Sequence, residues 1–311
     1  MLNLRCASRV FYLLLLLLAG QQLCAQRSVS VLRAATLPEH AAGNREVALR
    51  EAETFTFDRN LIFFEARVNG EPGNFILDTG APTLVMNNRG EATAGSNYQG
   101  FGSGGSVELS DHRVEVFEMS GLSLENYWAI GLDLRGMESR TGQRIDGMVG
   151  YDLLNDGELR IDYSDRSFRL LPSERRPLHE GAQPRAVLRF SLIDHLPVVR
   201  LRINGRRYDF AIDTGAGSNL VDEKVARELK LPTTGEGMNI LGLDGRAVDA
   251  DLVTLAAPAE FAGGAEDIHL VTMDLSHLDD QNGRLAGILG SAFLSQYTIG
   301  IDYRRRKIYV W

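Results

Sequence analysis

The sequence is poor in cysteine, and several other signatures of nucleophilic or metal chemistry are missing. Its two cysteines, Cys6 and Cys24, both fall within the first 25 residues, so the rest of the chain has no thiol nucleophile, no disulfide and no cysteine metal site. No His-Glu-x-x-His spacing, no Gly-x-Ser-x-Gly elbow and no Walker lysine after a glycine loop occurs. We interpret the histidines as surface or loop residues: His40, His112, His179, His195, His269 and His277. The sequence therefore predicts no metal and no cofactor.

Positive charge is scarce too, with 33 Lys and Arg against 41 Asp and Glu and a net charge of −8. Nucleic-acid binding depends on cationic contacts to phosphate, so this balance argues against a nucleic-acid partner. The one cationic run, Arg304-Arg305-Arg306-Lys307, lies between Asp302 and Ile308-Tyr309-Val310. This position favours a hairpin turn over a site for a polyanion.

One long hydrophobic run occurs, Val10 to Ala19, and it is shorter than the roughly 20 apolar residues that span a bilayer. Two arginines and no acidic residue precede it, and Leu23-Cys24-Ala25 follows it. This order predicts a secretory signal in residues 1–25, cleaved before Gln26, and export to the periplasm or cell surface of a bacterium. Two alternatives stay open, and either would give membrane association: an uncleaved N-terminal anchor or, ranked lower because no small residue precedes it, lipidation of Cys24.

The chain does contain one short motif written twice. Phe75-Ile76-Leu77-Asp78-Thr79-Gly80-Ala81 reappears as Phe210-Ala211-Ile212-Asp213-Thr214-Gly215-Ala216, with the two aspartates 135 residues apart. A single Asp-Thr-Gly is common turn chemistry, but the same offset also carries Asn69-Gly70 onto Asn204-Gly205. Self-similarity over this length indicates a duplicated unit.

The duplication continues downstream at an offset of 140 residues. Ile145 to Gly150 reappears as Leu285 to Gly290, and Ile161-Asp162-Tyr163 reappears as Ile301-Asp302-Tyr303. The second copy thus carries about five extra residues in its middle, an insertion of loop size. Each half is predicted to run as strand, turn, strand, Asp-Thr-Gly loop, variable middle, apolar-apolar-Gly, short helix and final strand pair.

The order of these motifs resembles the aspartic peptidases of the retropepsin and pepsin type, in the form found in two-lobed bacterial aspartyl-protease-family proteins. The resemblance covers nearly the whole chain beyond residue 55. It implies an all-β acid-protease fold: two retropepsin-like β-barrel lobes related by a pseudo-two-fold axis, with a few short helices. Short strands separated by turn signals agree with that class.

The composition divides the chain accordingly. Residues 26–50 are poorly patterned, although an early strand is expected near Val29 to Leu32. Residues 51–172 form the predicted N-terminal lobe and residues 187–311 the C-terminal lobe. Residues 173–186 are rich in proline and charge and are predicted to be the linker.

In each lobe the Asn-Gly dipeptide predicts a tight hairpin, whose first strand is Leu61 to Val68 or Leu196 to Ile203. One helix is expected in the second lobe, beginning at a capping Asp222 and ending before Pro232. The matching segment of the first lobe, Asn87 to Gly95, is too rich in Gly and Asn to predict the same helix.

The expected chemistry follows from two carboxylates held together. A pseudo-two-fold pairing of the lobes would place Asp78 and Asp213 side by side, and two like charges at contact distance cannot both ionise cheaply. The pair would hold one proton and titrate as a unit. Its ionised member would take a proton from a water that attacks the peptide carbonyl, while its protonated member donates to the carbonyl oxygen.

The resemblance also implies supporting residues in the two loops: Thr79, Gly80, Ala81, Thr214, Gly215 and Ala216. The threonines would hydrogen-bond across to the opposite loop, and the glycines would let the backbone turn tightly. Gly150 and Gly290 would let a strand pack behind each loop, although core packing alone also accounts for them. Where pepsin-like relatives often have a Ser or Thr donor, this chain has Ala81 and Ala216, which should raise the apparent pKa values of the pair. We therefore expect activity at weakly acid to neutral pH.

A glycine-rich stretch in the first lobe, Tyr98 to Ser106, resembles the flap, a hairpin that closes over substrate and excludes water. Gly100 to Gly105 also fits the Gly-x-Gly-x-x-Gly fingerprint of dinucleotide sites, but no apolar strand leads in and no helix is expected to follow, so we reject that interpretation. A flexible surface loop is the alternative to a flap. The flap candidates are Tyr98, Gly102, Gly104, Gly105 and, in the second lobe, Gly242.

The sequence thus predicts an exported aspartic endopeptidase, with peptides or unfolded protein as substrate and no nucleic-acid partner. Both carboxylates lie on one chain, which favours a monomer over pairing of one lobe with a lobe of another chain. The alternative is a non-catalytic relative that binds peptide or protein in the same cleft. Intact Asp-Thr-Gly in both halves favours the enzyme, because paired perturbed carboxylates are costly to retain for structure alone.

Overall fold

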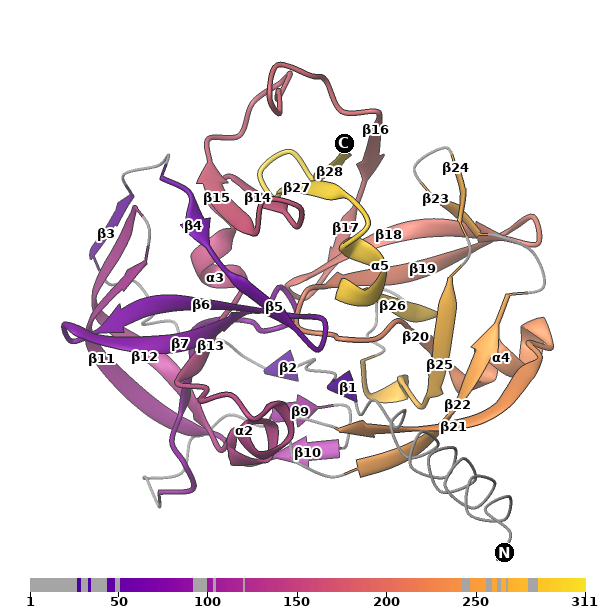
Figure 1. Cartoon of the computed structure of the whole chain (residues 1–311), viewed down its shortest axis with the longest axis horizontal. Coiled ribbons are helices and arrows are strands. Elements are labelled where there is room, and N and C mark those ends of the chain that lie inside the picture. Colours follow the sequence, from indigo (N-terminus) through magenta and orange to yellow (C-terminus); the bar gives the residue numbers. More distant parts are fainter. Residues whose placement is uncertain are drawn as a thin grey trace, which may run out of the picture.

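The computed structural model describes residues 27–28, 33–34, 44–47, 51–91, 100–102, 105–119, 121–241, 247–255, 259–261, 264–266, 268–278 and 285–311. This part of the chain confirms the predicted class, an all-β protein with a few short helices. Its strands form two lobes, and a further sheet joins them (Figure 1).

Lobe one is built on a closed barrel of six strands. In barrel order these are β6 (Leu61–Val68), β7 (Glu71–Leu77), β13 (Gly147–Val149), β8 (Val85–Asn87), β12 (Leu122–Leu132) and β11 (Ser110–Met119). Pairing of β11 with β6 closes the ring, so these strands leave no free edge. β5 (Thr56–Asp58) pairs with β6, and β3 (Asn44–Val47) pairs with β12.

Lobe two is an open sheet with the same central strand order. Its strands, in order, are β1 (Arg27–Ser28), β21 (Thr233–Leu241), β22 (Ala247–Thr254), β25 (His269–Met273), β20 (Leu220–Asp222), β26 (Gly287–Gly290), β19 (Arg206–Asp213), β18 (Leu196–Ile203), β23 (Ala259–Phe261) and β24 (Gly264–Glu266), with β17 (Ser191–Ile193) beside β18. The run from β22 to β18 repeats the run from β11 to β6, strand for strand. The duplication seen in the sequence is therefore a duplication of topology.

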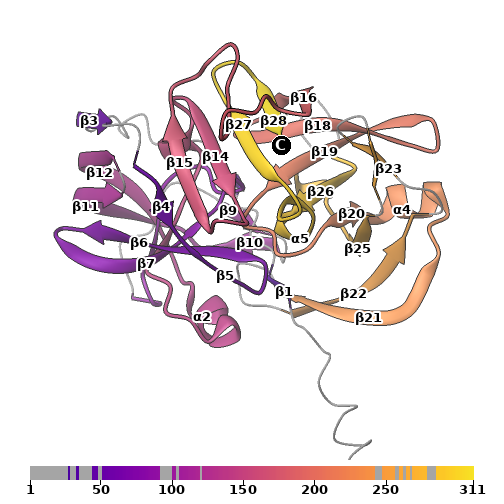
Figure 2. The same ribbon diagram turned by 45° about the horizontal axis from the view of Figure 1, so that its top comes forward.

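A six-stranded sheet joins the two lobes. After its apolar-apolar-Gly strand each half makes a short helix and two strands: α3 (Tyr151–Leu154), β14 (Glu158–Asp162) and β15 (Ser167–Leu171), then α5 (Ser291–Leu294), β27 (Thr298–Asp302) and β28 (Lys307–Val310). These strands form one sheet in the order β16 (Ala186–Arg189), β28, β27, β14, β15 and β4 (Glu53–Thr54). β14 of lobe one pairs with β27 of lobe two, and these two strands lie near the top of the view in Figure 2. The segment predicted as linker leads from β15 to β16, and its last residue, Ala186, already belongs to β16.

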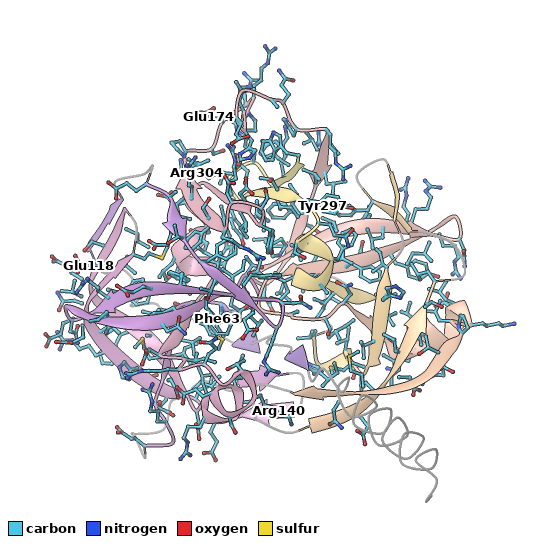
Figure 3. All side chains as sticks on the ribbon, viewed as in Figure 1. Phe63, Glu118, Arg140, Glu174, Tyr297 and Arg304 are labelled. Carbon is cyan, nitrogen blue, oxygen red and sulfur yellow. The ribbon has the colours of Figure 1, made fainter. Side chains whose placement is uncertain are left out.

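The apolar core reflects this junction. One buried cluster lies within the lobe-one barrel and includes Phe63, and a second lies within lobe two and includes Ile288. A third, larger cluster contains residues of both lobes, among them Phe75 and Phe210. Strand alternation sorts the side chains, so that Phe63 lies inside lobe one while Glu118 of β11 lies at its rim (Figure 3). Each lobe has a core of its own, but the two lobes also share one.

The local predictions largely hold. β6 and β18 have the predicted bounds, and both Asn-Gly turns have two positive φ angles, 52° and 83° at Asn69-Gly70 and 50° and 76° at Asn204-Gly205. These are the angles that a type I′ hairpin requires. The cationic run is confirmed as a turn, because β27 ends at Asp302 and β28 begins at Lys307.

The helix predicted in lobe two is α4 (Glu223–Leu229), and the Asp222 side chain accepts from the backbone N–H groups of Lys224 and Val225, as expected of an N-cap. At the matching place in lobe one, residues 88–91 form no helix, and residues 92–95 lie outside the described part. Two helical elements of the described residues were not predicted: α2 (Arg135–Thr141), which ends at Gly142 with φ 68°, and a 3₁₀ turn at Ser276–Leu278.

Little of the N-terminal region belongs to the described part. The signal predicted in residues 1–25 and the strand predicted near Val29 to Leu32 lie outside it. β1 pairs with β21 of lobe two, and β2 (Arg33–Ala34) joins β9 (Gly100–Gly102) and β10 (Gly105–Val107) of lobe one in a three-stranded sheet. No helix among the described residues is long and apolar enough to cross a membrane.

Candidate active site

The two Asp-Thr-Gly loops meet where the lobes face each other. Asp78 follows β7 and Asp213 ends β19, and both side chains have a relative exposure of 0%. The carboxyl group of Asp213 packs against the opposite loop so closely that a Cβ placed on Gly80 would lie 2.5 Å from its Oδ2. The structure therefore brings together the two aspartates that the sequence singles out, and it explains why a glycine follows Thr79.

Four hydrogen bonds from the two threonines tie the loops to each other. The hydroxyl of Thr214 accepts from the N–H of Thr79 at 3.0 Å and donates to the carbonyl of Leu77 at 2.8 Å. The hydroxyl of Thr79 accepts from the N–H of Thr214 at 3.0 Å and donates to the carbonyl of Ile212 at 3.2 Å. Each hydroxyl thus satisfies a buried donor and a buried acceptor of the other lobe, which fixes the spacing of the loops.

Each carboxyl group also receives a hydrogen bond from its own loop. The N–H of Gly80 donates to Oδ1 of Asp78, and that of Gly215 donates to Oδ1 of Asp213, both at 2.8 Å. Ala81 and Ala216 are fully buried, and their side chains offer no donor to the carboxylates. The backbone N–H groups of Ala81 and Ala216 donate to the carbonyls of Asp78 and Asp213, and the N–H of Ala216 also lowers the pKa of the Asp213 carboxyl group.

The pKa of Asp213 differs from that of an ordinary aspartate. Burial raises the pKa of Asp213 well above its usual range, and the nearby charge of Asp78 raises it further. The N–H groups of Gly215 and Ala216 lower the pKa of Asp213, but they do not outweigh burial. One carboxyl group of the pair therefore keeps its proton at pH values at which an exposed aspartate is ionised.

Two glycines behind the loops have no room for a side chain. A Cβ on Gly150 would lie 2.4 Å from the carbonyl oxygen of Ala81, and one on Gly290 would lie 2.3 Å from that of Ala216. Both contacts are with backbone that cannot swing away. The residue after each glycine is tied to the same loop, because the N–H of Tyr151 donates to the carbonyl of Ala81 and the N–H of Ser291 donates to the carbonyl of Ala216.

Among the side chains that reach across the lobe boundary, the sequence reasoning missed His195 and Asn60, which contact the active-site loops. His195, interpreted above as a surface or loop residue, lies in a turn but is only 4% exposed, and its Nε2 lies 2.9 Å from the carbonyl oxygen of Gly80. Asn60 donates from Nδ2 to the carbonyl of Gly217 at 2.9 Å. These two residues also lie 135 positions apart, so extending the repeat by one residue upstream of each first strand would have found them.

The flap candidates fall only partly within the described residues. Gly102 and Gly105 face each other in the antiparallel hairpin of β9 and β10, whereas Tyr98, Gly104 and Gly242 lie outside the described part. The hairpin rules out the strand-to-helix turn that a dinucleotide site requires. In lobe two, β21 and β22 form an antiparallel pair.

Other sites are less well formed. A cavity of about 530 Å³ opens between α4, β21, β22 and β25, but its walls include no residue of the Asp-Thr-Gly loops. Among the described residues no group of three or more His, Cys, Asp or Glu side chains is placed to hold a metal ion. The two loops are thus the best-supported chemical centre of the described part.

Comparison with known families agrees with this geometry. The family model described as aspartyl protease matches the chain over residues 64–153 and again over residues 199–293. Each match contains one Asp-Thr-Gly loop and one apolar-apolar-Gly strand. No curated protein matches the chain significantly. With a repeated family match, two lobes of one topology and paired loops at their junction, the chain belongs to the aspartyl protease family.

Proposed function

We propose that this protein is an exported aspartic endopeptidase that hydrolyses peptide bonds with a water activated between Asp78 and Asp213. The observation that carries the proposal is the pairing of two fully buried aspartates in loops that the threonines lock together. A structural role alone does not account for two acids at one buried junction, since desolvation makes such a pair costly.

The two roles in the proposed reaction follow from one proton shared by the pair. Burial and the charge of Asp78 raise the pKa of Asp213 well above its usual range, so the pair binds one proton, and we propose that Asp213 carries this proton at the start of the reaction. The N–H of Gly80 donates to Asp78 and that of Gly215 donates to Asp213 at the same distance, so these hydrogen bonds do not distinguish the two acids. At the start of the reaction Asp78 is therefore the general base and Asp213 the general acid.

The reaction then follows in two balanced steps. Asp78 takes a proton from the water while the water oxygen bonds to the peptide carbonyl carbon. Asp213 gives its proton to the carbonyl oxygen, and the product of this step is a neutral gem-diol. In the second step Asp78 gives its proton to the amide nitrogen, Asp213 takes one back from a diol hydroxyl, and the C–N bond breaks. The acid and amine products separate, and the pair again holds one proton.

The remaining parts of the proposal concern substrate and location. An endopeptidase needs a substrate that can enter as an extended strand, which suits peptides and unfolded protein. Both acids lie on one chain, which supports a monomer. The N-terminal sequence signal supports export, and an uncleaved or lipidated N-terminus would add membrane attachment.

The test is cleavage of an unfolded protein and a diverse peptide pool by the full chain between about pH 3 and pH 8, a range that spans the pKa values open to a carboxyl pair. Asp78→Asn and Asp213→Asn should each abolish cleavage while circular dichroism shows that they fold. Asp209→Asn is the matched control, because Asp209 is a partly exposed aspartate of the same strand, β19, as Asp213. A folded wild-type chain that binds peptides without cleaving them at any pH would instead favour the non-catalytic binding relative.

A further inference from the structure

Two of the side chains that reach across the lobe boundary, His195 and Asn60, occupy the same place in the repeat. Asn60 lies in the turn between β5 and β6, and His195 lies in the turn between β17 and β18. Each turn comes directly before the strand that leads into the hairpin of its lobe, and each side chain contacts the loop of the opposite lobe. The repeat therefore supplies one cross-lobe contact in each direction.

The contact of His195 has a defined polarity. A backbone carbonyl can only accept, so the imidazole nitrogen 2.9 Å from the Gly80 oxygen must carry a hydrogen. The ring is buried, and Tyr151 packs beside it with a ring-centre distance of 6.3 Å. Tyr151 is itself tied to the Asp78 loop through its N–H. His195 thus donates a hydrogen bond to the carbonyl of Gly80 from a fixed position.

The residue that His195 holds is the one that touches both carboxyl groups. The N–H of Gly80 donates to Oδ1 of Asp78, and the Cα of Gly80 packs against the carboxyl group of Asp213. A shift of Gly80 would therefore change the hydrogen bonding of one acid and the packing of the other. Catalytic groups lose large factors in rate when such positions move by about 1 Å.

The contact of Asn60 with lobe two does not involve the residue next to the catalytic aspartate. The repeat equivalent of Gly80 is Gly215, but Asn60 bonds to Gly217, two residues farther along the chain. Gly215 makes the hydrogen bond to Asp213, and Gly217 is not the residue that does so. Asn60 therefore crosses the same boundary without holding the residue next to the dyad, which makes it a natural control.

We propose that His195 is a positioning residue of the active site, which sets the place of Gly80 and through it the geometry of the Asp78–Asp213 pair. The inference rests on the proposed function for its effect on catalysis, but its effect on the loop does not depend on turnover. Lobe two thereby controls the acid that lobe one contributes.

Three variants of the full chain test this role. His195→Leu removes the donor and keeps an apolar side chain in the buried site, His195→Gln keeps an N–H at the reach of Nε2, and Asn60→Leu removes the control contact. The measurements are kcat and KM on one peptide substrate, and the hydrogen exchange rates of the Gly80 and Gly215 amides. Thermal unfolding reports the general cost of each change to the fold.

We expect His195→Leu to lower kcat by about tenfold or more with little change in KM, since the loss is one of geometry and not of substrate contacts. Its Gly80 amide should exchange about tenfold faster, while the Gly215 amide keeps its wild-type rate. His195→Gln should keep most of kcat and the slow Gly80 exchange. Asn60→Leu should lower stability but leave kcat within about threefold of wild type.

Two results would overturn the proposal. One is wild-type kcat and wild-type Gly80 exchange in His195→Leu. The other is an equal loss in Asn60→Leu and His195→Leu that follows their loss of thermal stability, because that would show general packing between the lobes. A wild-type chain without turnover but with the expected exchange pattern would refute the peptidase and still support His195 as the residue that positions Gly80.

Discussion

The threonine hydrogen bonds give a prediction whose size follows from the structure. Thr214→Val replaces a hydroxyl with a methyl group of nearly the same shape, so it opens no cavity. It removes the bond accepted from the Thr79 N–H and the bond donated to the Leu77 carbonyl. Both backbone groups belong to buried residues, and neither gains a new partner from valine.

A buried polar group left without a partner costs about 1–3 kcal/mol, so the two groups together should lower the free energy of unfolding by about 2–6 kcal/mol. That is a large share of the 5–15 kcal/mol by which domains are typically stable. Thr79→Val removes the equivalent pair of bonds, to Thr214 and Ile212, and should cost a similar amount.

Urea unfolding of the full chain measures the effect. Thr214→Ser is the control, because it keeps the hydroxyl and loses one methyl group, worth about 1 kcal/mol. A loss below about 1 kcal/mol in Thr214→Val, or an equal loss in the serine variant, would refute the reasoning that the hydroxyl satisfies both lobes.

Three further predictions concern the loops. Gly150→Ala should lower stability by about 1–3 kcal/mol or more, because its Cβ would meet backbone oxygens of Ala81 and Thr83, whereas Gly237→Ala, with open space around it, should be close to neutral in the same thermal or urea unfolding assay. Asp213→Asn should be more stable than wild type at neutral pH. Because the pKa of Asp213 is raised in the native state, the native state holds this proton at pH values above the unfolded pKa of about 3.9, where the unfolded state has lost it. Wild-type stability therefore falls as pH rises from the unfolded pKa to the native pKa, and the advantage of the variant disappears below the unfolded pKa. Unfolding curves of both proteins across pH measure this, and a variant whose stability relative to wild type does not increase from acid to neutral pH would contradict it. Activity should be highest at weakly acid to neutral pH, because Ala81 and Ala216 give the carboxylates no side-chain donor, and a sharp maximum near about pH 3 in a pH–rate profile would contradict this.

The parts of the fold that the sequence predicts well are those with a local cause. β6 and β18 alternate or run apolar up to an Asn-Gly turn, and α4 begins at an aspartate that caps it, so neighbouring residues were enough to place them. Two copies of one motif also predicted two lobes, because a repeat can bury its exposed face against a second copy.

The sequence patterns did not predict how the two lobes join. β14 and β27 are repeat equivalents that pair with each other, and no periodicity within either strand says which partner lies across its edge. The ion pair of Glu158 and Arg160 is buried in this sheet, with Nη2 and Oε1 2.6 Å apart, although both residues look solvent-facing in the sequence. Long-range pairing decides such positions, and local propensity does not.

In the candidate site, too, residues within a local motif were predicted and a residue that depends on long-range contacts was missed. Asp78 and Asp213 were found from a repeated motif, and the structure brings them together. His195 was missed because a lone histidine in a turn has the sequence signature of a surface residue, and only the opposite lobe makes it buried. The flap could be placed only in part, since Tyr98, Gly104 and Gly242 lie outside the described residues.

The central claim, that Asp78 and Asp213 act as one unit on one water, is tested most directly by the double variant Asp78→Asn/Asp213→Asn beside the two single variants. Groups that act as a unit are not additive in their effects on kcat. The account predicts that each single variant loses nearly all turnover and that the double variant is no worse than either. A single variant with near wild-type kcat, or losses that multiply in the double variant, would contradict it.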